Sequence, residues 1–516
     1  MLSKVKIRPK FLTEKQLILG LLLGAILLHT ISLGNLAIRD WDEGYYTVVA
    51  REMYRTGNWL YPSYLGNPFL LKPPLMHWLV ALSYHLGGVN EFTSRLPTAL
   101  LSAYSIPLIY LIGREVFSQR LPAIFSALVY LTLLPVVRNG RLAMLDGMSI
   151  TFFLIAIFCV LKARKQKIWA IGIGIALGLI GLTKGILVLL LGAIIALFLL
   201  FNGQLSLLKN LYLYLGLIVG GLPLFSWYFA QWHHYGDLFL EVHFQSQGFE
   251  RINNAVWGNT GPPWFYFLEL LKYSFPWLLF FPFGLYLAWQ KRHSSWGKLV
   301  LIGFCGYMGI ISIMGTKLPW YMLPAYGFFA LAVGSSLDKL WHSRFYPLWL
   351  TIIFAFFAFA ATGGLVYFIL ADPQIPLIIL AVVFAITMGL AAWQAQQNNP
   401  NFIPLLFVGT YLSLGLLMTS QAWIWELNEA FAVKPVGALI RENTNPKVPV
   451  YMSHYGRPSL DFYSDRVVIP LTNQNIEQLW QDKAYLLLDE VPLEQFQLPE
   501  SKILGTAEGF TLLVHR

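Results

Sequence analysis

The feature that most constrains the fold of this chain is a series of long apolar runs that recur along most of its length. A helix needs about 20 apolar residues to cross a hydrocarbon core of about 30 Å. About thirteen runs suit this role, near residues 16–36, 94–114, 121–138, 146–163, 168–182, 185–201, 210–231, 264–289, 298–316, 319–340, 346–370, 375–395 and 402–425. Only 12% of the residues are charged, about half the usual share in a soluble domain. The sequence therefore predicts an all-α polytopic membrane domain.

Basic residues between the runs predict how the chain is oriented in the membrane. Short loops rich in Lys and Arg stay in the cytoplasm, and four basic residues precede the first run, namely Lys4, Lys6, Arg8 and Lys10. With the N-terminus placed there, five later basic loops fall on the same side, at residues 114–120, 162–167, 209, 291–298 and 339–344. This distribution accounts for the formal net charge of +10 without a nucleic-acid partner. We expect an integral protein of the inner or plasma membrane.

Two helices are expected to lie on the membrane surface in the first outer loop, residues 37–93. Residues 42–56 carry apolar side chains with helical spacing, and Arg51 and Arg55 lie on the opposite face. The segment 72–88 is apolar but too short to span the membrane. Counting it as a span would move every later basic loop to the other side, so we predict an interfacial helix there.

The composition changes after residue 427. Residues 428–516 combine helical patterns at 428–442 and 475–482 with three short strand-like runs, VPVYMS, AYLLLD and FTLLVHR. This pattern predicts a small α/β domain, and the odd number of spans places it in the periplasm or outside the cell. The chain is thus expected to have two domains, a transmembrane domain at 1–427 and an extracytoplasmic one at 428–516.

Charged residues of both signs collect on the predicted outer side of the membrane. They include Asp40, Asp42, Glu43, Lys72, Arg138, Arg141, Asp146, Lys184, His243, Glu250, Arg251 and Lys317. Any one of them could be a solvated surface charge, and Asp146 could simply cap the helix that it opens. Charged groups at membrane depth are costly, however, and usually face a cavity or a partner. Acids and bases together on one face favour a catalytic or binding cavity.

Such a set of side chains suits transfer of a group from a lipid-linked phosphate. Cations neutralise the charge that grows on a departing phosphate, and a carboxylate can take the proton of an acceptor hydroxyl. The predicted cytoplasmic loops contain neither a P-loop nor a dinucleotide-binding glycine motif, so we expect no nucleotide site. One base without an obvious nucleophile favours a single displacement with inversion.

Four motifs carry a resemblance to a known family. DWDEGYY (40–46), KPPLMHW (72–78), RLAMLD (141–146) and KLPWYMLP (317–324) occur in this order ahead of the α/β tail. Together they resemble the polytopic GT-C glycosyltransferases, and most of all the protein O-mannosyltransferase-like enzymes and the lipid A aminoarabinose transferases. The resemblance implies a polyprenyl-phosphate sugar donor and an acceptor on the outer side, which could be a lipid, a glycan or a protein.

The resemblance also implies roles for single residues. Asp42, Glu43 and Tyr46 match the Asp-Glu-x-x-Tyr motif of the family, and Asp146 matches its second acid. We predict Asp42 as the key catalytic carboxylate, supported by Glu43 and Asp146, and Asp40 as a surface charge. The residues expected to contact the substrates are Tyr46, Lys72, Arg141, His243, Arg251, Lys317 and Tyr321.

Two positions depart from the aminoarabinose transferases. Those enzymes carry an acid before the Lys-Pro lysine that can hold a metal together with a loop histidine matching His243, whereas this chain has Leu71 there. A divalent metal near His243 is therefore not predicted, and no cofactor is expected. The other departure is Tyr45, where the relatives tend to have Arg. Both weaken lipid A modification as the specific function and leave the wider glycosyltransferase prediction intact.

Two other classes of protein remain open at this stage. A transporter or flippase for lipid-linked sugars would carry polar residues along a path through the spans to both faces. A membrane receptor with the tail as sensor would need far fewer spans. The gathering of polar residues on one face favours the enzyme over both.

Overall fold

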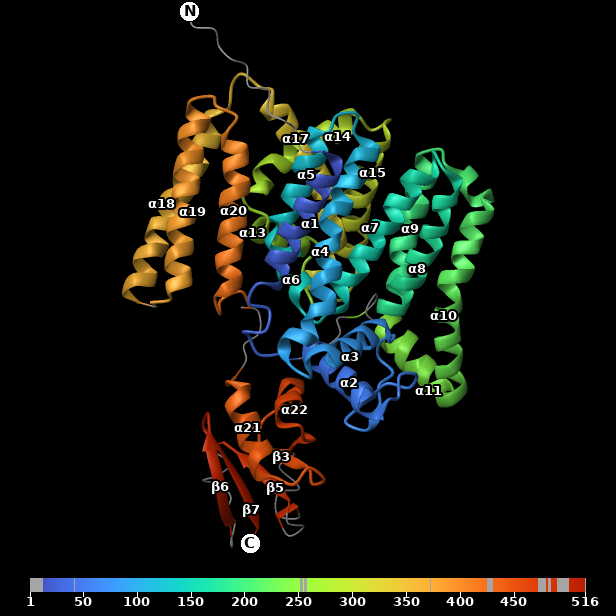
Figure 1. Cartoon of the computed structure of the whole chain (residues 1–516), viewed down its shortest axis with the longest axis vertical. Coiled ribbons are helices and arrows are strands. Elements are labelled where there is room, and N and C mark those ends of the chain that lie inside the picture. The colour runs from blue at the N-terminus through green and yellow to red at the C-terminus, as the bar shows by residue number, and fades with distance from the viewer. Residues whose placement is uncertain are drawn as a thin grey trace, which may run out of the picture.

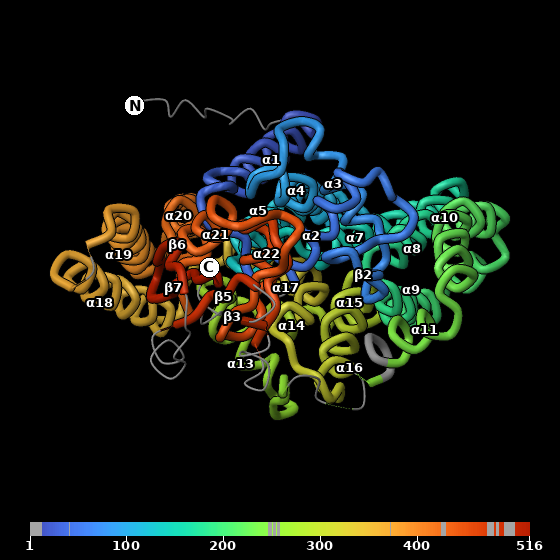
Figure 2. Tube along the Cα trace, turned by 90° about the horizontal axis from the view of Figure 1, so that it is seen from below, coloured from blue at the N-terminus to red at the C-terminus, as the bar shows by residue number. Residues whose placement is uncertain are grey.

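A computed structural model describes residues 13–40, 42–250, 254, 258–371, 373–424, 430–471, 479–480, 484–489 and 501–515. Long helices form the upper part of the molecule, and two shorter helices, α2 and α3, lie beneath them (Figure 1). A small unit of helices and strands from the C-terminal part of the chain lies below α2 and α3. Helices α18 to α20 and α8 to α10 lie at opposite sides of the central helices (Figures 1 and 2).

Every apolar run of the sequence is largely helical in the structure. The helices of this part are α1 (Glu14–Thr30), α2 (Asp42–Thr56), α3 (Leu75–Gly87), α4 (Glu91–Val116), α5 (Leu121–Leu131), α6 (Leu134–Arg141), α7 (Leu145–Ala163), α8 (Ala170–Lys184), α9 (Leu187–Phe201), α10 (Leu211–Tyr235), α11 (Asp237–Leu240), α13 (Phe265–Tyr273), α14 (Phe281–Gln290), α15 (Ser295–Val300), α16 (Tyr307–Ile313), α17 (Tyr326–Trp341), α18 (Leu348–Leu370), α19 (Ile375–Gln396) and α20 (Phe402–Thr419).

The number of membrane spans in the structure can be compared with the thirteen that the sequence predicts. Eight helical segments of the described chain are long and apolar enough to cross a membrane, or ten if each of two bent pairs counts as one span. The bends are 55° between α5 and α6 and 114° between α13 and the segment 277–290. Helices α1, α9 and α17, with 17, 15 and 16 residues, are shorter than the usual span. A polytopic helical fold is therefore confirmed, while the count of thirteen stays a prediction.

Three of the predicted cytoplasmic loops meet at one end of the molecule. Glu115 pairs with Lys165 across 2.9 Å, and Arg164 donates a hydrogen bond of 2.9 Å from Nη1 to Ser295 Oγ. These contacts join the loops that follow α4, α7 and α14, at the end opposite α2 and α3 (Figure 1). These three basic loops thus share one side, and the assignment of that side to the cytoplasm stays a prediction.

Helix α8, whose last residue is Lys184, is fixed by unusually close packing against α10. A Cβ added at Gly174 would lie 2.1 Å from Leu217 N, and one added at Gly178 would lie 2.1 Å from Gly220 O. Only glycine permits the two backbones to approach this closely, as at other tight helix crossings in membranes. This close packing fixes the position of α8 along α10, and it therefore also fixes the position of Lys184 at the end of α8.

Helices α2 and α3 cover the predicted interfacial segments, but α2 is not a free surface helix. Its apolar residues Tyr46, Val49 and Met53 are buried in the core of the helical part. Its charged face, expected to meet water, faces the C-terminal unit, where Arg51 pairs with Asp465 at 3.2 Å. The amphipathic pattern identified the helix, whereas its second partner lies too far along the chain to be read from the local sequence.

The C-terminal unit is the predicted α/β structure. It contains α21 (Val433–Asn443), β3 (Val450–Met452), α22 (Pro458–Ser464), β4 (Val468–Pro470), β5 (Tyr485–Leu488), β6 (Ser501–Ala507) and β7 (Phe510–His515). The sheet order is β4-β3-β5-β7-β6; β3 is parallel to β4 and β5, and β7 is antiparallel to β5 and β6. The predicted boundary at 427/428 and most of the predicted helix at 475–482 lie outside the described residues.

Candidate functional site

A cavity of about 310 Å³ opens between α7, α8, α9, α16 and the short helix η7 (Pro319–Ala325). Its polar lining consists of Lys72, Asp146, Ser149, Lys184, Tyr307 and Tyr321. The rest of its wall is apolar, built from Ile150, Ile186, Leu187, Leu189, Leu190, Ile310, Ile311, Met314, Trp320 and Pro324. The cavity therefore has a charged region on one part of its wall and apolar side chains on the rest.

The centre of the charged region is an ion pair. Lys184 Nζ, at the end of α8, lies 2.5 Å from Asp146 Oδ1 in the first turn of α7. Gly185 ends α8 immediately afterwards with a φ of +51°, a conformation that favours glycine. The N-terminus of α7 has no side-chain hydrogen bond at its cap. Asp146 is therefore a partner of Lys184 rather than a helix cap.

Three further predicted residues lie around this pair. Tyr321 places its ring 5.5 Å from Lys184 Nζ, and its carbonyl accepts a hydrogen bond of 2.8 Å from the Tyr307 hydroxyl. Lys72 lines the same cavity. The charges of Lys72 and Asp42 both act on the Asp146 carboxylate, and Asp42, the first residue of α2, does not belong to the described lining of the cavity.

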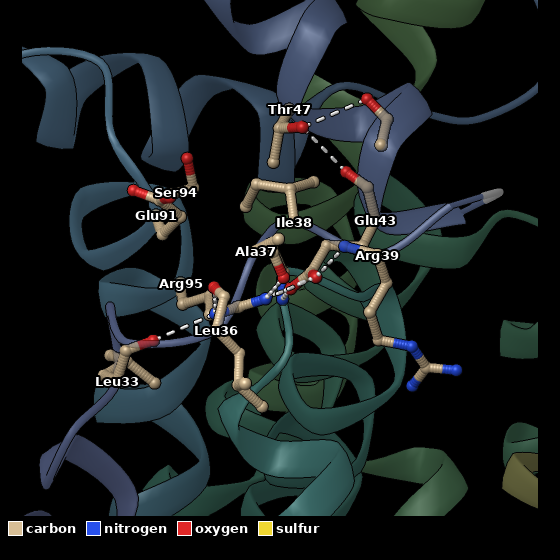
Figure 3. A network of polar contacts seen from close by, with 12 residues as sticks. Leu33, Leu36, Ala37, Ile38, Arg39, Glu43, Thr47, Glu91, Ser94 and Arg95 are labelled. Carbon is tan, nitrogen blue, oxygen red and sulfur yellow. Dashed lines mark hydrogen bonds and ion pairs between the residues drawn. The ribbon is translucent and has the colours of Figure 1, made fainter. Parts of the chain in front are cut away.

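Asp42 and Glu43 are neighbours with different surroundings. Asp42 is partly exposed. Glu43 is only 1% exposed, and both of its carboxylate oxygens accept hydrogen bonds (Figure 3). Arg95 donates 2.8 Å hydrogen bonds to each oxygen of Glu43, and the backbone N–H groups of Arg39 and Ala143 donate at 2.8 and 2.9 Å. The remaining Arg95 donors bind the carbonyls of Leu33, Leu36 and Ala37.

The Glu43 network fixes the chain where α1 leads into α2. Burial alone would raise the pKa of the Glu43 carboxyl, but the Arg95 charge and the four hydrogen bonds hold that pKa below its usual value. The carboxylate stays ionised without facing the cavity. Its geometry is that of a structural ion pair that holds Asp42, one residue earlier, in place.

Asp40 corrects an expectation. It is 5% exposed, and its Oδ2 accepts a 2.5 Å hydrogen bond from Arg457 Nε. The hydroxyl and the backbone N–H of Ser459 bind its other oxygen. The prediction that Asp40 is a surface charge is wrong, because the C-terminal unit folds back over the first outer loop and buries it.

Arg141 and Lys317 donate hydrogen bonds to backbone carbonyls at helix ends and do not line the cavity. Arg141 donates to Leu28 O at 2.8 Å and to Ile31 O at 2.6 Å, at the end of α1. Lys317 Nζ donates to Ser312 O at 2.6 Å and to two further carbonyls at the end of α16. Carbonyls at helix C-termini lack partners within the helix. Both cations therefore bind backbone carbonyls in this structure, and their expected role at a donor phosphate stays a prediction.

The other predicted substrate contacts also lie away from the cavity or outside the described chain. Tyr46 is 4% exposed and packs edge-on against His77, with ring centroids 5.5 Å apart. Arg251 lies outside the described residues.

His243 is held by hydrogen bonds within the protein. Its Nδ1 donates to Leu70 O at 3.0 Å, which leaves Nε2 to accept from the Tyr228 hydroxyl at 2.7 Å. Burial lowers the pKa of His243 to about 4, so the ring is neutral near pH 7. In the described parts of the chain, no three His, Cys, Asp or Glu side chains are grouped to hold a metal ion. These residues do not fit a metal site, and independence from metal stays a prediction.

Comparison with known proteins shows which proteins this chain resembles. Residues 71–229 match the family described as Dolichyl-phosphate-mannose-protein mannosyltransferase. An undecaprenyl phosphate-alpha-4-amino-4-deoxy-L-arabinose arabinosyl transferase of Pseudomonas fluorescens is 29% identical over 58% of this chain and 56% of its own length. An uncharacterised protein of Aquifex aeolicus is 28% identical over 88% of both chains. The alignments with arabinosyl transferases such as the first span little more than half the length of those relatives.

A solved structure shares the fold along nearly the whole chain. The crystal structure of ArnT from Cupriavidus metallidurans bound to undecaprenyl phosphate matches with a TM-score of 0.80, covering 96% of this chain and 97% of that one at 18% identity. This chain is similar over part of its length to the aminoarabinose transferases and to the O-mannosyltransferase family, and it shares the fold of ArnT. The matched segment 71–229 contains Lys72, Asp146 and Lys184, which line the cavity.

Two residues of the chain carry more weight in the structure than the sequence indicates. The sequence places Lys184 among the charges of the predicted outer side and assigns it no role, although a lysine directly before a glycine at the end of an apolar run is a usable signal. The sequence motifs assign no role to Arg95 either, although an arginine at the start of an apolar run needs an ionic partner. That partner is Glu43, 52 positions earlier.

Proposed function

We propose that this protein is a membrane glycosyltransferase that moves a sugar from a polyprenyl-phosphate donor to an acceptor outside the cytoplasm. The observation that carries the proposal is the cavity, whose apolar wall suits a prenyl chain. Lys72 and Lys184 at its charged region suit the phosphate. Lipid, glycan and protein acceptors all remain compatible with this cavity.

The proposed reaction is a single displacement at the anomeric carbon. Asp42 takes the proton of the acceptor hydroxyl, and the acceptor oxygen forms the new glycosidic bond as the bond from the sugar to the phosphate oxygen breaks. The electron pair of the broken bond remains on the polyprenyl phosphate. Lys72 and Lys184 neutralise the charge that grows there. The sugar configuration inverts because the reaction has one displacement and no covalent enzyme intermediate.

The other residues of the site act by holding these groups. In the free enzyme, Asp146 fixes Lys184 through their 2.5 Å contact, and we propose that the donor phosphate competes for the same ammonium group. Tyr321 covers Lys184 from one side. Glu43, Arg141 and Lys317 keep the surrounding chain in position. Direct contacts from Arg251 and His243 to substrate belong to the proposal as further candidates.

The test uses purified full-length protein in lipid nanodiscs with a panel of polyprenyl-phosphate sugars. Mass spectrometry follows the release of polyprenyl phosphate and the appearance of the sugar on added acceptor. We expect one donor class to be consumed by the wild type. Consumption of none would contradict the proposal, and movement of an intact donor across a liposome membrane without sugar release would favour a flippase.

A further inference from the structure

Helix α22 of the C-terminal unit lies directly against the first turn of α2 (Figure 2). A Cβ added at Gly44 would lie 2.8 Å from Pro458 Cβ and 2.9 Å from Ser459 N. The two backbones therefore touch only two residues after Asp42. Any movement of α22 at this point is transmitted to the turn that carries Asp42.

A buried ion pair fixes the same place. Asp40 and Arg457 have side chains that are 4% and 0% exposed, and they meet at 2.5 Å. Arg457 Nη1 also donates to Phe431 O at 2.8 Å, which ties the pair to the segment that enters the C-terminal unit. Ser459 adds its hydroxyl and its N–H to Asp40. Asp40 thus accepts hydrogen bonds from the residues before and after Pro458, which fixes the orientation of its carboxylate relative to α22.

The far end of α2 is held by the same helix. Arg51 Nη1 donates to Phe462 O at 2.8 Å, and Arg51 and Arg55 both pair with Asp465, at 3.2 and 2.5 Å. Contacts at both ends of α2 prevent it from tilting or sliding along α22. The C-terminal unit therefore acts on α2 as a clamp with two points of contact.

We infer that the C-terminal unit positions the catalytic carboxylate, with Asp40 and Arg457 as positioning residues. The inference rests on the proposed function, in which Asp42 takes the proton of the acceptor. Lys72, Asp146 and Lys184 lie outside α2, so the position of Asp42 relative to them depends on the placement of α2. A misplacement of about 1 Å at a reacting group can reduce the rate about 100-fold.

The test compares two buried arginines of the same unit. Arg457→Met removes the partner of Asp40. Arg466→Met is the matched control. Arg466 is 8% exposed and donates only within the unit as described, to the side chain and carbonyl of Thr444 and to the backbone carbonyls of Arg441 and Asp465, and it has no described contact with Asp40. We expect Arg457→Met to reduce kcat for sugar transfer at least tenfold and to leave the Kd for undecaprenyl phosphate within twofold. Arg457→Lys should recover part of kcat, and Arg466→Met should remain near the wild type.

Three results would overturn the inference. They are an unchanged kcat in folded Arg457→Met protein, an equal loss in Arg466→Met, and a parallel loss of undecaprenyl phosphate binding in Arg457→Met. If Arg457→Met does not fold, Asp40→Asn, which keeps the side-chain shape, decides the question by the same criteria.

Hydrogen–deuterium exchange separates this inference from the proposed function. Amides at the start of α2 should exchange faster in Arg457→Met than in wild type or Arg466→Met. This difference is measurable even if the wild type transfers no sugar, a result that would defeat the proposed function alone. Equal exchange in all three proteins would defeat the positioning role.

Discussion

Two acid–base pairs at helix ends near α2 look alike in sequence and differ in structure. Glu43 with Arg95 and Asp146 with Lys184 each join a carboxylate in the first turn of a helix to a cation on another helix. The first pair is almost fully buried and the Glu43 oxygens receive four hydrogen bonds. The second has a single short contact and lines an open cavity.

The difference teaches which pair can take part in binding. A phosphate cannot replace Glu43 without leaving the buried Arg95 and two backbone N–H groups to reorganise. A phosphate can approach Lys184 from the cavity, because Lys184 keeps donor hydrogens beyond the one that faces Asp146. One pair therefore stabilises the fold, and we propose that the other exchanges its partner during the reaction.

The largest expected effect is on stability, from Glu43→Gln. Removing one member of a buried ion pair costs about 3–5 kcal/mol because the remaining charge loses its partner. Thermal unfolding of the purified protein, followed by tryptophan fluorescence, should show this loss. If the Glu43→Gln protein is as stable as the wild type, the Glu43–Arg95 pair does not stabilise the fold, and the distinction between it and the Asp146–Lys184 pair fails.

Lys184→Met should affect transfer strongly and stability little. Loss of one group that stabilises developing charge reduces rates by about 100- to 1,000-fold. The assay is donor consumption in nanodiscs, with Lys165→Met as control because Lys165 is an exposed lysine in a similar ion pair at the opposite end. Wild-type turnover in Lys184→Met would contradict the proposed role of the second pair.

Lys317→Met should show the opposite pattern to Lys184→Met. It leaves three carbonyls at the end of α16 without their donor, which we expect to cost about 1–3 kcal/mol of stability. The KM for the donor should stay within twofold, because Lys317 does not line the described cavity. A large rise in KM without loss of stability would restore the sequence-based assignment of Lys317 to the donor phosphate.

The smallest expected effect is a pH dependence of the Glu43 contribution. The folded-state pKa of Glu43 is lowered, so its stabilising effect is complete above the unfolded-state pKa of about 4.3 and is lost as the pH falls from there through the folded-state value. The stability difference between wild type and Glu43→Gln should therefore be greatest near neutral pH and shrink below about pH 4. A difference that is constant down to strongly acidic pH would contradict the ionic nature of this pair.

The sequence predicted most of the helices because their signals are local. Length, apolar content and helical spacing located α2 and the long helices, and three short strand-like runs located β3, β5 and β7. The bend between α5 and α6 escaped prediction because an apolar run around Pro135 does not show whether the helix continues through it. The number of spans depends on such bends and was not settled by hydropathy.

The candidate site was only partly predictable. Lys72, Asp146 and Tyr321 meet at one cavity as expected, because each lies at the outer end of its segment. Arg141 and Lys317 were expected beside them, but they bind the carbonyls at the ends of α1 and α16. A cation near a helix end can bind either a ligand or the free carbonyls of that end, and the sequence does not distinguish these roles. The partner of Asp40 lies 417 positions away, beyond any local signal.

The most direct test of the central claim is sugar transfer by Asp42→Asn measured beside the wild type. Asparagine keeps the shape of the side chain and cannot take a proton, so we expect transfer to fall about 100- to 10,000-fold. Thermal unfolding and undecaprenyl phosphate binding should remain unchanged. Transfer at the wild-type rate by folded Asp42→Asn protein would contradict the account.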